Sequence, residues 1–244
     1  MKRSTIGFIL LGVLTVVALV GLFLMPIVAQ KGKYHDFSDV AIVFGISNFW
    51  NVVSNIPFLV VGILGLSKVN SFAASKTQYA IFFLGVALVA FGSGYYHFDP
   101  NNVTLVWDRL PMTVAFMALF SMIISEFVDF KLGQQLLFPM VLVGLLSVVY
   151  WVIFNDLRFY ALVQYYPIFA IPIILIFFKS SYTMSYGYWT LLLSYLIAKV
   201  LEKFDYAAHD FLNVISGHTL KHIVIAIGIY SLIHTFIKRR KTLS

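Results

Sequence analysis

The chain has 244 residues, of which 61% are hydrophobic and 11% are charged. Soluble domains carry about 25% charged residues, so this composition excludes a water-soluble globular protein. The net charge of +7 would suit a nucleic acid, but the basic residues are placed as in membrane proteins, and we expect no nucleic-acid partner. The absence of cysteine excludes disulfides, thiolate metal sites and cysteine nucleophiles.

Long apolar runs predict an all-α integral membrane protein, because a helix needs about 20 apolar residues to cross the hydrocarbon core. In chain order, the expected helices cover residues 5–29, 47–67, 77–97, 104–126, 132–154, 160–179, 186–203 and 213–237. The first apolar run exceeds the about 7–15 residues of a signal peptide, so residues 1–30 are expected to be an uncleaved anchor helix. Residues 31–244 are then expected to form one seven-helix membrane domain.

An even number of crossings places both termini on the same side of the membrane. Lys2 and Arg3 precede the first helix, and residues 238–241 form a basic segment after the last one. The positive-inside rule therefore favours cytoplasmic termini. The short loops and compact length suggest a bacterial inner membrane.

Five polar residues fall at one expected depth, near the outer ends of three helices. Ser93 and His97 close the third segment, Asp108 opens the fourth, and His218 and His222 open the eighth. Ionisable groups at such depth are costly and usually mark function. The predicted topology alone therefore brings these side chains to a common level.

The spacing of His218 and His222 places both imidazoles on one face of a helix. Two such histidines and a third from another helix can hold zinc and leave its fourth position open to water. A second interpretation is structural, because histidines also form hydrogen bonds between membrane helices. His97 and Asp108 would then be a neutral interhelical pair.

These residues lie in motifs that resemble a known family. The stretches "GSGYYH" (92–97), "WDRLPM" (107–112) and "GHTLKH" (217–222) are similar to signatures of alkaline ceramidases and of the wider CREST superfamily of membrane hydrolases. The stretch "NFWNVVSNIPFLVVGILGL" (48–66) resembles the family's first core helix. The similarity covers about residues 34–237.

The resemblance implies a seven-helix bundle that hydrolyses the amide of ceramide, a membrane lipid, to a sphingoid base and a fatty acid. It assigns zinc to His97, His218 and His222. It also implies that Asp108 lies near the zinc-bound water as general acid and base, and that Ser93 belongs to the active centre.

Eukaryotic members of the family also bind calcium through an acidic loop before the first core helix. Here Asp36 and Asp39 have a similar spacing, but Asn48 stands where the family has an acidic residue. An asparagine oxygen can bind calcium with less charge and therefore more weakly. The alternative is that both aspartates are solvated loop residues.

Two other functions remain compatible with the same motifs. One is a lipid esterase or phospholipase of the same superfamily, and the other is a metal-containing seven-helix receptor, like the progestin and adipoQ receptors, without turnover. Lys221 is expected to extend toward the outer interface or to contact a substrate headgroup. Asn51 and Ser54 are expected to pair with neighbouring helices rather than to act chemically. The oligomeric state is not readable from the sequence.

Overall fold

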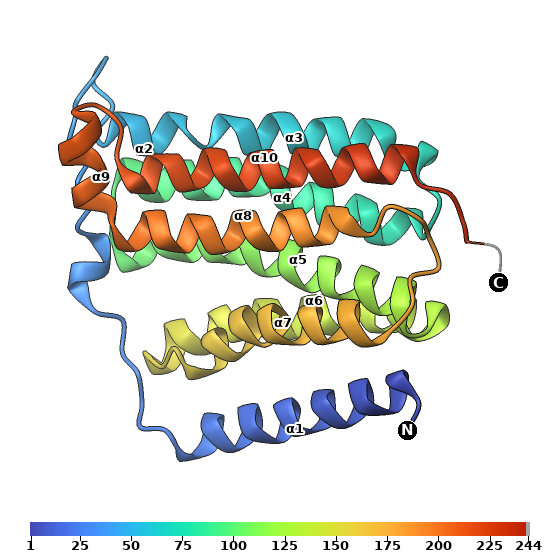
Figure 1. The fold of residues 1–244 in the computed structure, drawn as a ribbon. Coiled ribbons are helices and arrows are strands. Elements are labelled where there is room, and N and C mark those ends of the chain that lie inside the picture. Colours follow the sequence, from blue (N-terminus) through green and yellow to red (C-terminus); the bar gives the residue numbers. More distant parts are fainter. Residues whose placement is uncertain (243–244) are drawn as a thin grey trace.

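The computed structural model describes residues 1–242, and no named strand occurs within them (Figure 1). Seven segments of this described part are long and apolar enough to cross a membrane, which confirms the all-α membrane fold. The long helices are α1 (Arg3–Leu24), α3 (Ile56–Lys68), α4 (Lys76–Phe98), α5 (Asn102–Phe127), α6 (Phe130–Phe154), α7 (Arg158–Phe177), α8 (Tyr186–Lys203) and α10 (Gly217–Lys238). Shorter helices are η1 (Gly32–His35), α2 (Phe49–Val53), η2 (Val69–Ser71) and α9 (Asp205–Leu212).

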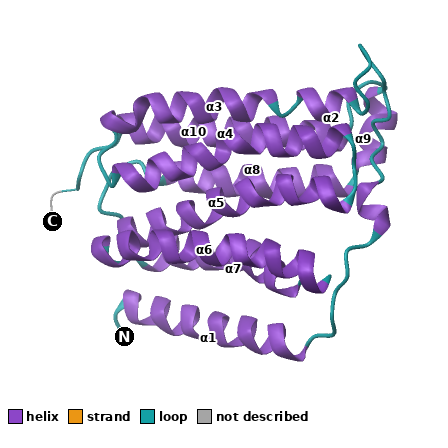
Figure 2. Cartoon of the chain, turned by 180° about the vertical axis from the view of Figure 1, so that it is seen from behind, coloured by secondary structure: helices purple, strands orange, loops and turns teal. Residues whose placement is uncertain are grey.

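The long helices run roughly parallel to one another, with α9 lying across one end of the bundle (Figures 1 and 2). The start of α1 and the end of α10 both lie at the opposite end, on different sides of the bundle, as the even number of crossings predicts. We call these the α9 end and the terminal end. Helix α1 packs against α7 at the side of the bundle, as an additional helix outside the seven others.

Apolar side chains face both the inside and the outside of the bundle. Phe83, Ile123 and Leu232 are fully buried in the core, whereas Phe8 and Phe23 of α1 are exposed. Exposed apolar helix surfaces of this extent are stable in lipid, where each helix satisfies its own backbone hydrogen bonds. The hydrocarbon of a bilayer is therefore the solvent that this surface fits.

The second crossing is broken between α2 and α3, at Ser54 and Asn55. Pro57 lies in the first turn of α3, where it has no N–H to offer to the preceding turn. At the same break the Asn55 backbone N–H bonds to the Val52 carbonyl oxygen, and the Asn55 side-chain amide donates to the Asn51 carbonyl oxygen at 2.8 Å. The break leaves Ser54 beside the N-terminal half of α10.

The structure corrects two details of the predicted helices. The last crossing begins at Gly217 rather than at residue 213, because Ser216 caps it by accepting a hydrogen bond from the Thr219 N–H at 3.1 Å. Residues expected to form only a connection instead form α9. Helix α8 forms where residues 186–203 predict it and lies beside α10, although it is not among the seven segments that are long and apolar enough to cross a membrane.

Candidate metal centre and adjoining cavity

Three histidines meet near the α9 end of the bundle. His97 comes from α4, and His218 and His222 come from successive turns of α10. Each offers one ring nitrogen, and these atoms all lie within 4.8 Å of one another. All three residues are at most 6% exposed. The predicted convergence of imidazoles from two helices is therefore present, in an arrangement that can hold a metal ion.

The spacing of one pair of ring nitrogens fits a tetrahedral ion. Two nitrogens bound to zinc at about 2.0–2.1 Å in a tetrahedral arrangement lie roughly 3.3 Å apart. The Nε2 atoms of His97 and His218 are 3.2 Å apart. The donor set is also suitable, because neutral imidazoles are common zinc ligands and need no charge in an apolar surrounding.

Ser54 fixes the orientation and tautomer of His222. The Ser54 hydroxyl donates to the Asn51 carbonyl oxygen at 3.0 Å and lies 2.8 Å from His222 Nδ1. Because the Ser54 hydroxyl proton is already bonded to the Asn51 carbonyl, the hydroxyl oxygen accepts a hydrogen bond from His222 Nδ1–H. The Nε2 atom of His222 is then unprotonated, and its lone pair is available to a metal. Such hydrogen bonds are what orients a histidine toward a metal. The predicted pairing of Ser54 with a neighbouring helix is thus observed, and its partner is a histidine of the cluster.

Two features hold the start of α10 in place. A side chain at Gly217 would collide with the Leu201 carbonyl oxygen, so only glycine lets α10 approach α8 this closely. The buried Asp205 of α9 accepts hydrogen bonds from the His218 N–H at 2.7 Å and from the Ser38 N–H at 2.9 Å. This carboxylate therefore fastens both the first turn of α10 and the loop before α2.

Ser93 and Asp108 lie on neighbouring turns of α4 and α5 because the two helices approach closely at Gly92. Pro111 has no N–H, which leaves the Trp107 carbonyl oxygen without its usual helical donor. That oxygen packs directly against Gly92, where any side chain would collide with it. The contact places Ser93 and Asp108, each one residue further along its helix, on the wall of the same cavity.

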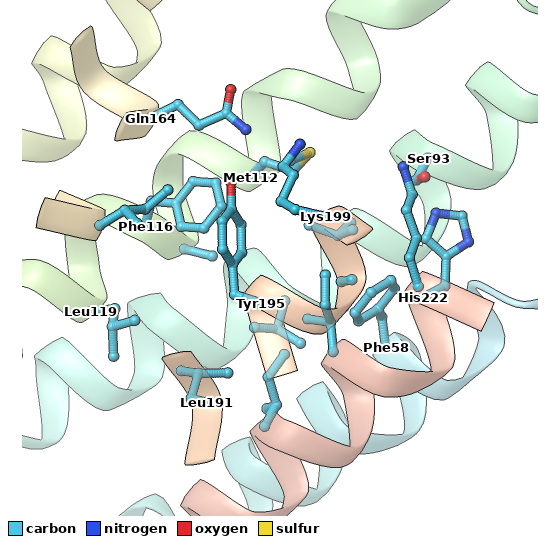
Figure 3. A pocket seen from close by; sticks show the side chains of 18 of the residues that line it. Phe58, Ser93, Met112, Phe116, Leu119, Gln164, Leu191, Tyr195, Lys199 and His222 are labelled. Atoms are coloured by element: carbon cyan, nitrogen blue, oxygen red, sulfur yellow. The ribbon is translucent and has the colours of Figure 1, made fainter. Parts of the chain in front are cut away.

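That cavity begins at the three histidines and extends toward the middle of the bundle. Its walls include both His218 and Ile229, which are eleven residues apart in α10. At 1.5 Å per helical residue, this separation corresponds to about 16 Å. Figure 3 shows His222 and Ser93 on one side of the cavity and the apolar Leu119 and Leu191 on another. The site thus joins a polar end to an apolar channel.

Phe37 covers the histidines on the side of the loop before α2. Its ring centroid lies 4.7 Å from that of His97 and 4.5 Å from that of His218. The loop is fastened nearby, since the two ring nitrogens of His35 lie 2.9 Å from the Tyr96 hydroxyl and 2.9 Å from the Asn102 side-chain oxygen. This aromatic cover limits the approach of water from that end of the bundle.

Two of the three residues considered for calcium, Asp39 and Asn48, have other partners in the structure. The buried Asp39 accepts the backbone N–H groups of Ala41 at 3.1 Å and of Asn51 at 2.9 Å. Asn48 donates its side-chain amide to the His97 carbonyl oxygen at 2.8 Å, and Asp36 is exposed. These contacts give Asp39 and Asn48 roles in fastening the loop, and calcium binding stays a prediction.

Several residues that shape the site had no recognisable signal in the sequence. Asp205 stands in the connection between two predicted helices, and Phe37 stands in the loop before another. Their roles depend on contacts between segments far apart in the chain. His35 and His209, by contrast, lie outside the histidine cluster, and His234 is exposed near the terminal end.

Comparison with known proteins agrees with this geometry. A family model described as Ceramidase matches residues 38–243, which includes all three histidines, Ser93 and Asp108. The match begins after α1, as does the seven-helix part of the bundle. No curated protein matches the chain.

Proposed function

Because the chain belongs to the ceramidase family, we propose that it is a zinc-dependent intramembrane hydrolase, acting on the amide bond of ceramide or a related N-acyl lipid. The products are a sphingoid base and a fatty acid. One observation carries the proposal: three histidines with metal-ligand spacing share a cavity with Ser93, Asp108 and an apolar channel. A lipid amide needs all of these features at once.

His97, His218 and His222 are the residues that would hold the metal. When bound, zinc supplies a Lewis acid for the carbonyl and lowers the pKa of a water molecule. The histidines' own contribution is position: Asp205 holds the His218 backbone and Ser54 holds the His222 ring, so little reorganisation is needed.

Asp108 is the proposed general base and acid. Its carboxylate accepts a proton from the attacking water as the water oxygen bonds to the amide carbon. It then delivers that proton to the leaving amine nitrogen as the carbon–nitrogen bond breaks. The Ser93 hydroxyl donates a hydrogen bond to the carbonyl oxygen, which becomes negatively charged during the attack.

The apolar part of the cavity is suited to an acyl chain. Lining side chains in the middle of the bundle come from α4, α5, α7, α8 and α10, and include Phe82, Met112, Ile171, Leu192 and Ile225. Their contact with a hydrocarbon chain holds the amide at the polar end. We further propose that the α9 end faces outward, since the basic segments Lys2–Arg3 and 238–241 lie at the terminal end.

The test is turnover of a fluorescently labelled ceramide by the purified full-length protein. We expect release of labelled fatty acid, loss of that release on chelation, and recovery with zinc. The Asp108→Asn variant should lose turnover, whereas Asp210→Asn, which changes an exposed aspartate on α9, should retain it. Turnover of lipid esters alone would favour an esterase, and no turnover of either class would favour a receptor.

A further inference from the structure

Two lysines and one glutamate form a charged cluster in the wall of the proposed catalytic cavity. Lys199 and Glu202 come from the last turns of α8, and Lys221 comes from α10 between the two histidines. The Lys199 ammonium lies 2.8 Å from one Glu202 carboxylate oxygen, and the Lys221 ammonium lies 3.9 Å from the other. We call these three residues the Lys–Glu–Lys cluster.

Lys221 does not extend toward the outer membrane interface, which is one of the two positions that the sequence predicts for it. Its side chain is 15% exposed and lines the cavity, so it does not extend freely to the interface. The close approach of α10 to α8 at Gly217 is what brings Lys221 level with Glu202. The other expectation, contact with a substrate headgroup, is compatible with this position.

The cluster carries one more positive charge than its single carboxylate neutralises, and Asp108, the proposed general base, is the other acidic side chain in the cavity wall. Two ammonium groups share one carboxylate, and the shorter contact commits that carboxylate mainly to Lys199. A charge inside a cavity loses much of its hydration, so an unmatched ammonium there is costly unless a ligand pairs with it. The proposed amide hydrolysis uses none of these three residues.

Additional polar groups surround the cluster on the side away from the histidines. The Tyr195 hydroxyl is buried, and Gln164 lies in the same wall. Figure 3 shows Lys199 between Tyr195 and Gln164 on one side and Ser93 and His222 on the other. The polar end of the cavity is therefore larger than an amide requires.

We propose that the Lys–Glu–Lys cluster binds an anionic group in the polar head of the lipid substrate, namely a phosphate, a sulfonate or a carboxylate. The chain then prefers N-acyl lipids with an anionic head over neutral ceramide. This proposal rests on the proposed function and names the substrate class for the same cavity. A neutral headgroup leaves one ammonium unmatched, and a cationic headgroup is repelled by it.

The first arm of the test compares turnover of matched lipids by the purified full-length protein. The pair is ceramide and ceramide 1-phosphate with the same acyl chain, and an N-acyl amino acid with a free carboxylate is the third lipid. We expect a higher kcat/KM for both anionic lipids than for ceramide. Preference for only one of them distinguishes a phosphate site from a carboxylate site.

Charge variants then connect this preference to the cluster. Lys199→Met should reduce the ratio of anionic to neutral turnover about tenfold, because Glu202 is then free to pair with Lys221 and the anionic head loses one hydrogen bond to a charged group. Glu202→Gln should raise the ratio, because it removes the competing carboxylate. Lys203→Met is the matched control, since this exposed lysine on α8 makes the same charge change outside the cavity.

A binding arm keeps this proposal separate from the hydrolase proposal. Displacement of a fluorescent lipid by each of the three lipids is measured in Asp108→Asn protein, with and without Lys199→Met. Tighter binding of anionic lipids that depends on Lys199 supports the cluster even if no lipid is hydrolysed. Turnover of ceramide with equal binding of neutral and anionic lipids, unchanged by Lys199→Met, overturns the cluster proposal and leaves the hydrolase intact.

Discussion

The hydrogen bond from His222 to Ser54 predicts that a residue outside the metal cluster controls metal affinity. Ser54→Ala removes the only acceptor that the described structure provides for His222 Nδ1–H. The tautomer that binds metal through Nε2 would then carry an unpaired buried N–H, which costs about 1–3 kcal/mol. The other tautomer avoids this cost but blocks Nε2.

The expected loss follows from this shift between tautomers. Each 1.4 kcal/mol lowers an equilibrium constant tenfold, so about 1–3 kcal/mol corresponds to roughly a 5- to 150-fold weaker affinity. Phe58 still contacts the His222 ring, with centroids 5.8 Å apart, and limits its rotation. We therefore expect a loss near the lower part of this range, about tenfold, as for other groups that orient metal ligands.

The assay is competition for zinc between the purified protein and a chromophoric chelator. Ser67→Ala is the matched control, because Ser67 is an exposed serine of α3 whose hydroxyl donates to the Leu64 carbonyl oxygen. Ser54→Thr keeps a hydroxyl and should restore most of the affinity. Equal zinc affinity in Ser54→Ala and Ser67→Ala, with unchanged thermal stability, would refute the tautomer argument.

Two further predictions concern stability. Asp39→Ala should lower the free energy of unfolding by roughly 2–4 kcal/mol, because two backbone amides lose their acceptor in a buried position. Thermal unfolding in detergent measures this loss, and the exposed Asp36→Ala is the control, for which we expect little change. Hydrogen bonds from Arg158 lower the pKa of Asp156 to about 2, so this carboxylate stabilises the folded state above its unfolded pKa of about 4. That contribution is lost as the pH falls from about 4 toward 2. The difference in melting temperature between the wild type and Asp156→Asn should therefore shrink over the same interval. A constant difference would contradict a lowered pKa of Asp156.

The membrane fold and the convergence of the histidines could be predicted because both follow from local patterns. The lengths of the apolar segments indicate how many times the chain crosses the membrane, and the number of crossings determines which helix ends lie on the same side. His97 and His222 therefore had to lie at one depth whatever their chemistry. Their approach to within metal-binding distance needed in addition the packing of α10 against α2, α3 and α8.

Contacts that depend on distant segments could not be predicted. Glu202 stands near the end of an amphipathic run, where a charged residue ordinarily faces water or headgroups. Its pairing with Lys221 requires the glycine contact between α8 and α10, which no single-helix pattern indicates. The same holds for Ser54, whose role depends on the helix break before Pro57.

The central claim is that His97, His218 and His222 together hold one metal ion, and metal analysis of the purified full-length protein tests it most directly. We predict one zinc per chain in the wild type and in Asp210→Asn, and loss of bound zinc in His97→Ala. His97 is the decisive position because it alone comes from a helix other than α10. A folded wild-type protein that takes up no metal, or a His97→Ala variant that keeps one zinc per chain, would contradict the account.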